Sequence, residues 1–328
     1  MTEAQSDNMI AEDLCGIANL HRFRHYAMAA SFDVFVVHND AEYAGQAARA
    51  AFEELDRIEN NLSRFLENSD ISRINSLGAG QSLQIGLETF ECLRTSIEMC
   101  KQTKGAFDIT FGSSHTGSKL MKLNKAEHTI ELSTDGVRLD LGAIGKGYAA
   151  DKMGQVLSEW GIKAALISAG QSTVLPIGTP LRLLVEDKSG GWPVTLSDLV
   201  DCHLLARINL VGCALSASGI RKGPHIIDPR AGNPATRLGE GAPADTEGID
   251  SLSRSRKGKL AAWSLAKTAA SADALSTAFM VMSVDEIKAF CSAHRGVSAF
   301  IILAGKKKGS RNRILRFGNW DKFISQPA

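Results

Sequence analysis

A carboxylate and a hydroxyl lie four residues apart in a stretch of the chain that is expected to be helical. Asp273 and Thr277 fall at the start of a helix expected over residues 273–282, so both side chains project from one face. Their oxygens are ligands that Mg²⁺ accepts, and backbone carbonyls, water and substrate phosphate would complete its shell. Asp also caps helix starts, so the spacing indicates either a magnesium site for a nucleotide diphosphate or a capped helix.

A histidine offers a second reactive group. His225 lies in an apolar stretch, and Asp228 and Pro229 follow it closely. An imidazole titrates near neutral pH and is the natural base for a hydroxyl nucleophile. A histidine in such a stretch can also have a purely structural role, and these residues alone leave both interpretations open.

Small residues surround two further ionisable side chains. Asp108 lies just after Gly105, and Lys146 lies between two glycines. Small neighbours allow a ligand to approach the backbone closely, as phosphate-binding loops require. The sequence has no G-x-x-x-x-G-K-[ST] pattern, which excludes a P-loop, and the spacing of Gly142 and Gly145 fits the Rossmann fingerprint poorly.

Hydropathy patterns predict the elements that must position these residues. Apolar residues at three-to-four-residue spacing predict helices, and short alternating or continuous apolar runs predict strands. Helices are expected over residues 41–66, 88–101, 145–160, 273–282 and 284–294. Strands are expected over residues 32–37, 164–168, 181–186, 204–210 and 298–303, with a hairpin formed by residues 129–132 and 137–140.

The same patterns predict the domain organisation. Residues 1–25 are polar and are expected to form a loosely ordered segment, followed by a single domain over residues 26–328. Within that domain, residues 236–259 are rich in glycine, serine and charge without periodicity, which predicts an inserted surface loop. The basic residues near the C-terminus are typical of a solvated edge.

Composition and charge exclude several classes of protein. The chain is 44% hydrophobic and 22% charged, with a formal net charge of +1, so its overall charge would not attract nucleic acid or an anionic membrane. The six cysteines include no C-x-x-C pair, which argues against a disulfide framework or a zinc site. Residues 1–30 contain neither a secretion signal nor a membrane span, so we expect a cytoplasmic protein.

Taken together and in order, several short segments resemble the ApbE family of flavin transferases. They comprise residues 62–65 with 69–75, 105–110, 140–151, 218–219, 225–232 and 273–277. The resemblance covers roughly residues 26–303. It implies a compact α+β fold, related to the T-fold, with mixed or antiparallel sheets and flanking helices.

The resemblance also implies a reaction. A Ser or Thr hydroxyl of an acceptor flavoprotein would attack the FMN phosphorus of FAD, with Mg²⁺ at the pyrophosphate, and AMP would leave. His225 would be the base, with Asp228 as the next candidate. The residues that match the family's flavin-nucleotide contacts are Met28, Phe65, Ala106, Phe107, Asp108, Asp140, Lys146 and Ile227. Those that match its metal ligands are the Ala143 carbonyl, Asp273, Ser276 and Thr277.

The sequence departs from the family pattern at four places, one of which is a longer span than usual between Asp228 and Asp273. Gly-Gly-Asp after the central strand is replaced by Gly170-Gln171-Ser172-Thr173, an early Met-Gly-Thr by Met28-Ala29-Ala30, and a common Tyr by Phe65. Two other functions stay open: the loss of Gly-Gly-Asp favours the first, and the second would use the same metal and base with water as the acceptor. One is an FAD-binding protein without transfer, and the other is an FAD pyrophosphatase that makes FMN and AMP.

Overall fold

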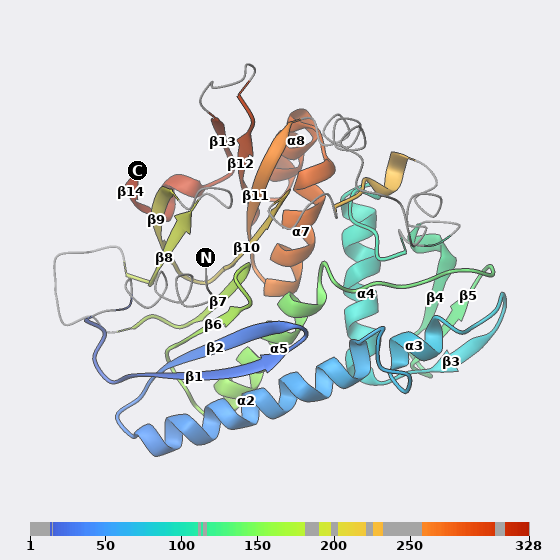
Figure 1. The fold of residues 1–328 in the computed structure, drawn as a ribbon, viewed down its shortest axis with the longest axis horizontal. Coiled ribbons are helices and arrows are strands. Elements are labelled where there is room, and N and C mark those ends of the chain that lie inside the picture. Colours follow the sequence, from blue (N-terminus) through green and yellow to red (C-terminus); the bar gives the residue numbers. More distant parts are fainter. Residues whose placement is uncertain are drawn as a thin grey trace, which may run out of the picture.

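The fold is built on one large antiparallel sheet. The computed structural model describes residues 14, 16–110, 113, 117–180, 190–197, 203–220, 226–231, 258–305 and 312–327. Within these residues the large sheet has eight strands, each antiparallel to its neighbours (Figure 1). In spatial order they are β1 (Leu20–Ala27), β2 (Ala30–Val37), β6 (Ala165–Ala169), β7 (Thr173–Ile177), β10 (Ala214–Gly219), β11 (Lys259–Ala266), β12 (Ser298–Leu303) and β13 (Arg313–Phe317).

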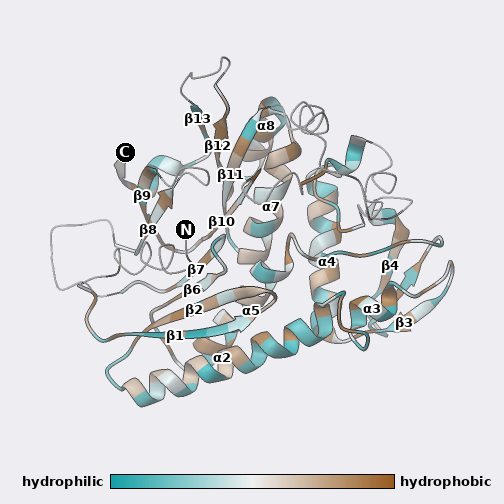
Figure 2. Cartoon of the chain, in the orientation of Figure 1, coloured by the Kyte–Doolittle hydropathy of each residue, from teal (hydrophilic) through white to brown (hydrophobic). Residues whose placement is uncertain are grey.

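Helices cover one face of this sheet. The helix α2 (Ala41–Leu62) packs on α5 (Gly145–Glu159), which in turn packs on α7 (Ala269–Val281), and α7 lies against β10 and β11. Figure 2 shows that the outward side of α2 is hydrophilic, as expected for an amphipathic helix at the surface. The remaining helices are α3 (Asp70–Ile74), α4 (Leu87–Gln102) and α8 (Val284–Ala293).

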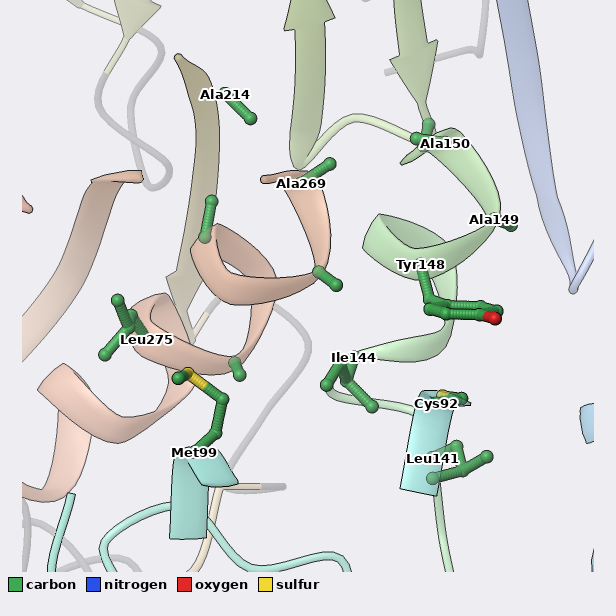
Figure 3. Close-up of a cluster of buried hydrophobic side chains, with 14 of the residues drawn as sticks. Cys92, Met99, Leu141, Ile144, Tyr148, Ala149, Ala150, Ala214, Ala269 and Leu275 are labelled. Atoms are coloured by element: carbon green, nitrogen blue, oxygen red, sulfur yellow. The ribbon is translucent and has the colours of Figure 1, made fainter. Parts of the chain in front are cut away.

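Two hydrophobic cores lie on the opposite faces of the large sheet. On the helical side, Tyr148 of α5, Leu275 of α7 and Met99 of α4 belong to one buried cluster (Figure 3). Successive residues of β12 alternate between the cores, because Ile301 lies in the helical core and Phe300 in the other. The second core is closed by a sheet of β14 (Ile324–Pro327), β9 (Leu204–Leu210) and β8 (Trp192–Ser197).

A third sheet lies beyond α3 and corrects the predicted hairpin. It comprises β3 (Ser82–Gln84), β5 (Thr129–Leu132) and β4 (Met121–Asn124), so the partners of β5 are β3 and β4 rather than residues 137–140. Residues 137–140 form no strand. The side-chain amide of Asn75 takes the place of a strand partner there, because it donates to the Leu139 carbonyl and accepts from the Leu139 N–H.

The N-terminal boundary at residue 25 is also wrong, because β1 begins at Leu20. This strand lies at the edge of the sheet, and its polar Arg22 and Arg24 pair with Asp33 of β2. An edge strand with polar side chains lacks the apolar pattern on which the boundary was based. The predicted loop over residues 236–259 ends too late, because Lys259 is the first residue of β11, and residues 236–257 and 181–186 lie outside the described residues.

The other predicted elements are confirmed with small shifts of their ends. The strands expected over residues 204–210 and 298–303 match β9 and β12, and the predicted helices match α2, α4, α5, α7 and α8. The α+β fold with a large antiparallel sheet and flanking helices is therefore confirmed.

Candidate functional site

Asp273 lies inside α7 and does not cap it. The helix begins at Ala269, and the N-cap is Thr268, whose side chain accepts a hydrogen bond from the Ser271 N–H. The interpretation of Asp273 as a helix cap is therefore wrong. Its carboxylate is instead directed into the interior, with 4% of the residue exposed.

Neutral donors surround the Asp273 carboxylate. The backbone N–H of Gly147 in the first turn of α5 donates to Oδ2 at 3.1 Å, and the Ser216 hydroxyl of β10 donates to Oδ1 at 3.2 Å. The Thr173 hydroxyl of β7 lies 3.5 Å from Oδ1. No lysine, arginine or histidine of the described chain forms an ion pair with Asp273. A buried carboxylate without a cation is costly, so within the part of the chain that the structure describes this position has a deficit of positive charge.

Further hydroxyls lie beside this carboxylate on the same helix. Ser276 is fully buried and donates to the Asp273 carbonyl at 2.9 Å. Ser218 of β10 lies 2.8 Å from the Ser276 hydroxyl and 3.2 Å from the Thr277 hydroxyl. The structure therefore brings Asp273 and Thr277 together, as predicted from their i, i+4 spacing, and places Ser276, which the resemblance added, beside them.

Ala143, the remaining predicted metal ligand, lies one residue before Ile144, the N-cap of α5. The start of α5 contacts the start of α7 so closely that a Cβ atom on Gly147 would lie 2.2 Å from the Ala269 carbonyl oxygen. Only glycine fits at this position without moving a helix. This contact places the start of α5, with Ala143 just before it, beside the helix that carries Asp273.

The segment that carries Lys146 lies near Gly170, where the sequence departs from the family pattern, and near the turn that follows Met28. The Lys146 ammonium donates to the Gly142 carbonyl at 3.3 Å. A Cβ atom on Gly170 would lie 3.9 Å from the Lys146 Cδ and 3.5 Å from the Ala30 Cβ. Ala30 follows the turn between β1 and β2, in which Met28 and Ala29 have φ values of 53° and 52°. Met28 therefore lies in a left-handed turn, two residues before the Ala30 that contacts Gly170.

Asp140 and Phe65 are linked through Arg64, which the sequence analysis did not single out. The Arg64 guanidinium lies 3.3 Å from the Asp140 carboxylate and 4.5 Å from the centroid of the Phe65 ring. Phe65 is 78% exposed, so its ring is free to stack on an aromatic ligand. The role of Arg64 follows only from its contacts in the folded chain, because an arginine next to an aromatic residue is common in any sequence.

The segment from Gly105 to Asp108 differs from the expectation. Ala106 and Phe107 are each 2% exposed and lie in the helical core, so Phe107 offers no open face to a flavin ring. Asp108 accepts hydrogen bonds from the N–H and the hydroxyl of Thr110, and burial raises the pKa of its carboxyl.

Asp228 is held by Arg230, a residue that the sequence analysis also missed. Both oxygens of the Asp228 carboxylate accept from the Arg230 guanidinium, at 3.0 and 3.1 Å. Arg230 also pairs with Glu286 of α8, and its Cγ lies 3.6 Å from the Cβ position of Gly105. The half-buried Ile227 lies on the same segment, and His225 lies outside the described residues.

The donor set around Asp273 fits Mg²⁺ better than a softer metal. It comprises one carboxylate and several hydroxyl oxygens, which are hard oxygen ligands. The described residues contain no group of three His, Cys, Asp or Glu side chains that could hold a metal without further donors. The predicted site thus requires water or a substrate phosphate to complete it.

Comparison with known proteins identifies the family. Residues 28–240 match the model of the ApbE family, which is more than half of the chain. The chain belongs to the ApbE family. This finding confirms the resemblance drawn from the short segments. In the part of the chain that the structure describes, no helix is both long and apolar enough to cross a membrane.

Named relatives of this ApbE-family chain are flavin transferases. A FAD:protein FMN transferase from Buchnera aphidicola subsp. Schizaphis graminum is 27% identical over 224 residues, which cover 56% of this chain and 63% of that protein. One from Treponema pallidum is 28% identical over 197 residues, which cover 56% of this chain and 48% of that protein. The aligned regions are therefore less than two thirds of the length of either relative.

Solved structures of the ApbE family share the fold over nearly the whole chain. The ApbE protein of Thermotoga maritima superposes with a TM-score of 0.75 at 22% identity and covers 94% of this chain and 100% of its own. The flavin transferase ApbE from Vibrio cholerae superposes with a TM-score of 0.72 at 18% identity and covers 93% and 99%. At these identities the comparison establishes the fold.

Proposed function

We propose that this ApbE-family chain is an FAD:protein FMN transferase that depends on Mg²⁺. Its substrates would be FAD and an acceptor flavoprotein with a target Ser or Thr, and its products the flavinylated protein and AMP. The names of the aligned relatives support the activity. The fit of the Asp273 donor set to a hard cation supports the metal.

The observation that carries the proposal is the uncompensated charge of Asp273. Among the described residues this buried carboxylate receives hydrogen bonds from neutral donors alone, and such a group is stabilised when a cation binds beside it. Asp273, Ser276, Thr277 and the Ala143 carbonyl would hold Mg²⁺. Bound there, the ion would act as a Lewis acid that polarises the FAD pyrophosphate.

The chain's own residues would then bind FAD and move one proton. Lys146 would place a positive charge near a phosphate, and the exposed ring of Phe65 would stack on an aromatic part of FAD. The acceptor hydroxyl oxygen would form a bond to the FMN phosphorus as the bond to the bridging oxygen of AMP breaks. His225 would take the hydroxyl proton.

Asp228 would position this segment rather than act as the base. Both of its oxygens are engaged by Arg230, which is anchored to Glu286 at the start of α8. An ion pair of this geometry fixes the orientation of the carboxylate and of the backbone around it. Ile227, the residue before Asp228, would thereby be held against the nucleotide.

The test is to incubate the full-length protein with FAD, Mg²⁺ and a panel of candidate flavoproteins, and to measure FMN adducts by mass spectrometry. We expect an adduct that requires Mg²⁺ and is lost in Asp273→Asn. The control is Asp285→Asn, which changes an exposed carboxylate in the first turn of α8. AMP without an adduct would indicate a pyrophosphatase. Binding of FAD without formation of either AMP or an adduct would indicate an FAD-binding protein.

A further inference from the structure

We propose that Thr173 and Ser216 are positioning residues that orient the Asp273 carboxylate for Mg²⁺. This inference rests on the proposed function and adds residues that lie outside the expected ligand set. Both side chains come from strands of the large sheet, whereas the expected side-chain ligands come from α7. Thr173 is also the last residue of the segment 170–173, where the sequence departs from the family pattern.

The two hydroxyls form a buried pair across neighbouring strands. Thr173 of β7 and Ser216 of β10 are directly opposite each other in the antiparallel register, and both residues are 0% exposed. Their hydroxyl oxygens lie 2.9 Å apart. Buried hydroxyls need partners, and these two find them in each other and in Asp273.

The distances set the direction of the hydrogen bonds. Each hydroxyl carries one proton to donate. The Ser216 oxygen is 3.2 Å from Asp273 Oδ1, whereas the Thr173 oxygen is 3.5 Å from it, at the limit of a hydrogen bond. The favoured arrangement therefore has Thr173 donate to Ser216 and Ser216 donate to Asp273. Thr173 acts on the carboxylate mainly through Ser216.

The Thr173–Ser216 pair binds one oxygen of the Asp273 carboxylate, and the first turn of α5 binds the other. Ser216 donates to Oδ1 and the Gly147 N–H donates to Oδ2, so the plane of the carboxylate is defined by two different elements. An ionised carboxylate has about four acceptor positions, and those that remain are available to a cation. Partners that orient a ligand in this way contribute about 10–100-fold to metal affinity.

The neighbouring strand offers a matched control. Ser264 of β11 is the register partner of Ser216, is also 0% exposed, and donates to the Ala272 carbonyl of α7 at 2.5 Å. It thus has the same residue type, burial and helix contact as Ser216 without a bond to Asp273. Ser264→Ala should lower thermal stability while leaving Mg²⁺ affinity unchanged.

The experiment compares Ser216→Ala, Thr173→Val, their double variant and Ser264→Ala as full-length proteins. Mg²⁺ alone is titrated against thermal unfolding, and the Mg²⁺ dependence of FMN-adduct formation is measured separately. We expect the midpoint for Mg²⁺ to rise about 10-fold or more in Ser216→Ala and less in Thr173→Val. Adding Thr173→Val to Ser216→Ala should raise it little further, since the two act in series.

The outcomes separate this inference from the proposed function. If the wild-type protein shows no Mg²⁺ dependence in either measurement, the metal site of the proposed function is wrong and the inference is wrong with it. If the wild type binds Mg²⁺ and the folded Ser216→Ala variant has the same midpoint within about twofold, only the inference is wrong. An equal shift in Ser264→Ala would also overturn it, because the effect would then come from the packing of α7.

Discussion

Asp151 and Lys259 hold opposite ends of α7 with opposite charges. The Asp151 carboxylate accepts from the N–H groups of Ala269 and Ala270 at 2.7 and 2.9 Å. The buried Lys259 ammonium donates to the carbonyls of Met280 and Met282 at the other end. Each charge opposes the partial charge of the helix end that it contacts, so both stabilise the helix that carries Asp273.

The first prediction concerns pH and Asp151. Burial raises the pKa of this carboxyl from 3.8 to about 6, despite the two backbone donors. The proton therefore binds more tightly in the folded state, so the stabilisation from protonation is complete below about pH 4 and is lost as the pH rises through about 6. Asp151→Asn cannot titrate. Its free energy of unfolding relative to wild type should rise between these pH values and then level off, as measured by urea denaturation. A constant difference across that range would contradict the assignment.

The second prediction concerns Lys259, which is 2% exposed. Lys259→Met keeps much of the side-chain volume but leaves the carbonyls at the end of α7 without a donor. We expect the free energy of unfolding to fall by about 1–3 kcal/mol, the cost of unsatisfied buried polar groups. Urea denaturation would measure it, with Lys267→Met as the control, because Lys267 is exposed just after β11. A similar loss in both variants would show that burial of Lys259 is not the cause.

The third prediction concerns the contact between α5 and α7. Gly147→Ala would place a methyl group 2.2 Å from the Ala269 carbonyl oxygen, so the helices must move apart. We expect a loss of about 1–3 kcal/mol in the free energy of unfolding, typical of overpacking, together with weaker Mg²⁺ binding. Gly296→Ala is the control, because no atom lies within 4 Å of its Cβ position. Unchanged Mg²⁺ binding in Gly147→Ala would argue against a metal site between these helices.

The fourth prediction separates two phenylalanines that the sequence analysis treated alike. Phe65→Ala should leave stability nearly unchanged and weaken FAD binding about 2–10-fold, since an aromatic contact contributes ~0.5–1.5 kcal/mol. Phe107→Ala should lower the free energy of unfolding by about 3–5 kcal/mol, because that ring is buried in the core. FAD titration and urea denaturation of both variants would check this. The reverse pattern would show that Phe107, not Phe65, contacts the ligand.

The difference between these two rings illustrates what could be predicted from the sequence. The helices α2, α4, α5 and α8 and the strand β12 followed from local periodicity, which depends only on neighbouring residues. Burial of one aromatic side chain and exposure of another depends on which elements lie above each, and no local pattern contains that information. The same applies to Lys259, since a lysine is rarely buried and its charge suggested a loop.

In the candidate site, too, some features could be predicted from local spacing and others depend on contacts between distant segments. The spacing of Asp273 and Thr277 placed both on one helical face, and in the structure both lie on α7, where one hydroxyl of β10, that of Ser218, contacts Thr277. The pairing of Thr173 with Ser216 could not be predicted, because it depends on β7 and β10 being neighbours although residues between them form other strands. Arg64 and Arg230 were missed for a similar reason, since their roles come from partners that only the folded chain brings close.

The strand order of the large sheet has a consequence for how the protein is made. Along the sheet the strands occur in the same order as along the chain, from β1 to β13. A chain emerging from the ribosome can therefore extend the sheet one strand at a time, with each new strand pairing to the one before it. The strands that carry Thr173 and Ser216 are synthesised well before α7, so Asp273, the proposed Mg²⁺ ligand, joins them later than either strand. Metal binding would then mark a nearly finished chain, and shorter nascent chains would lack it.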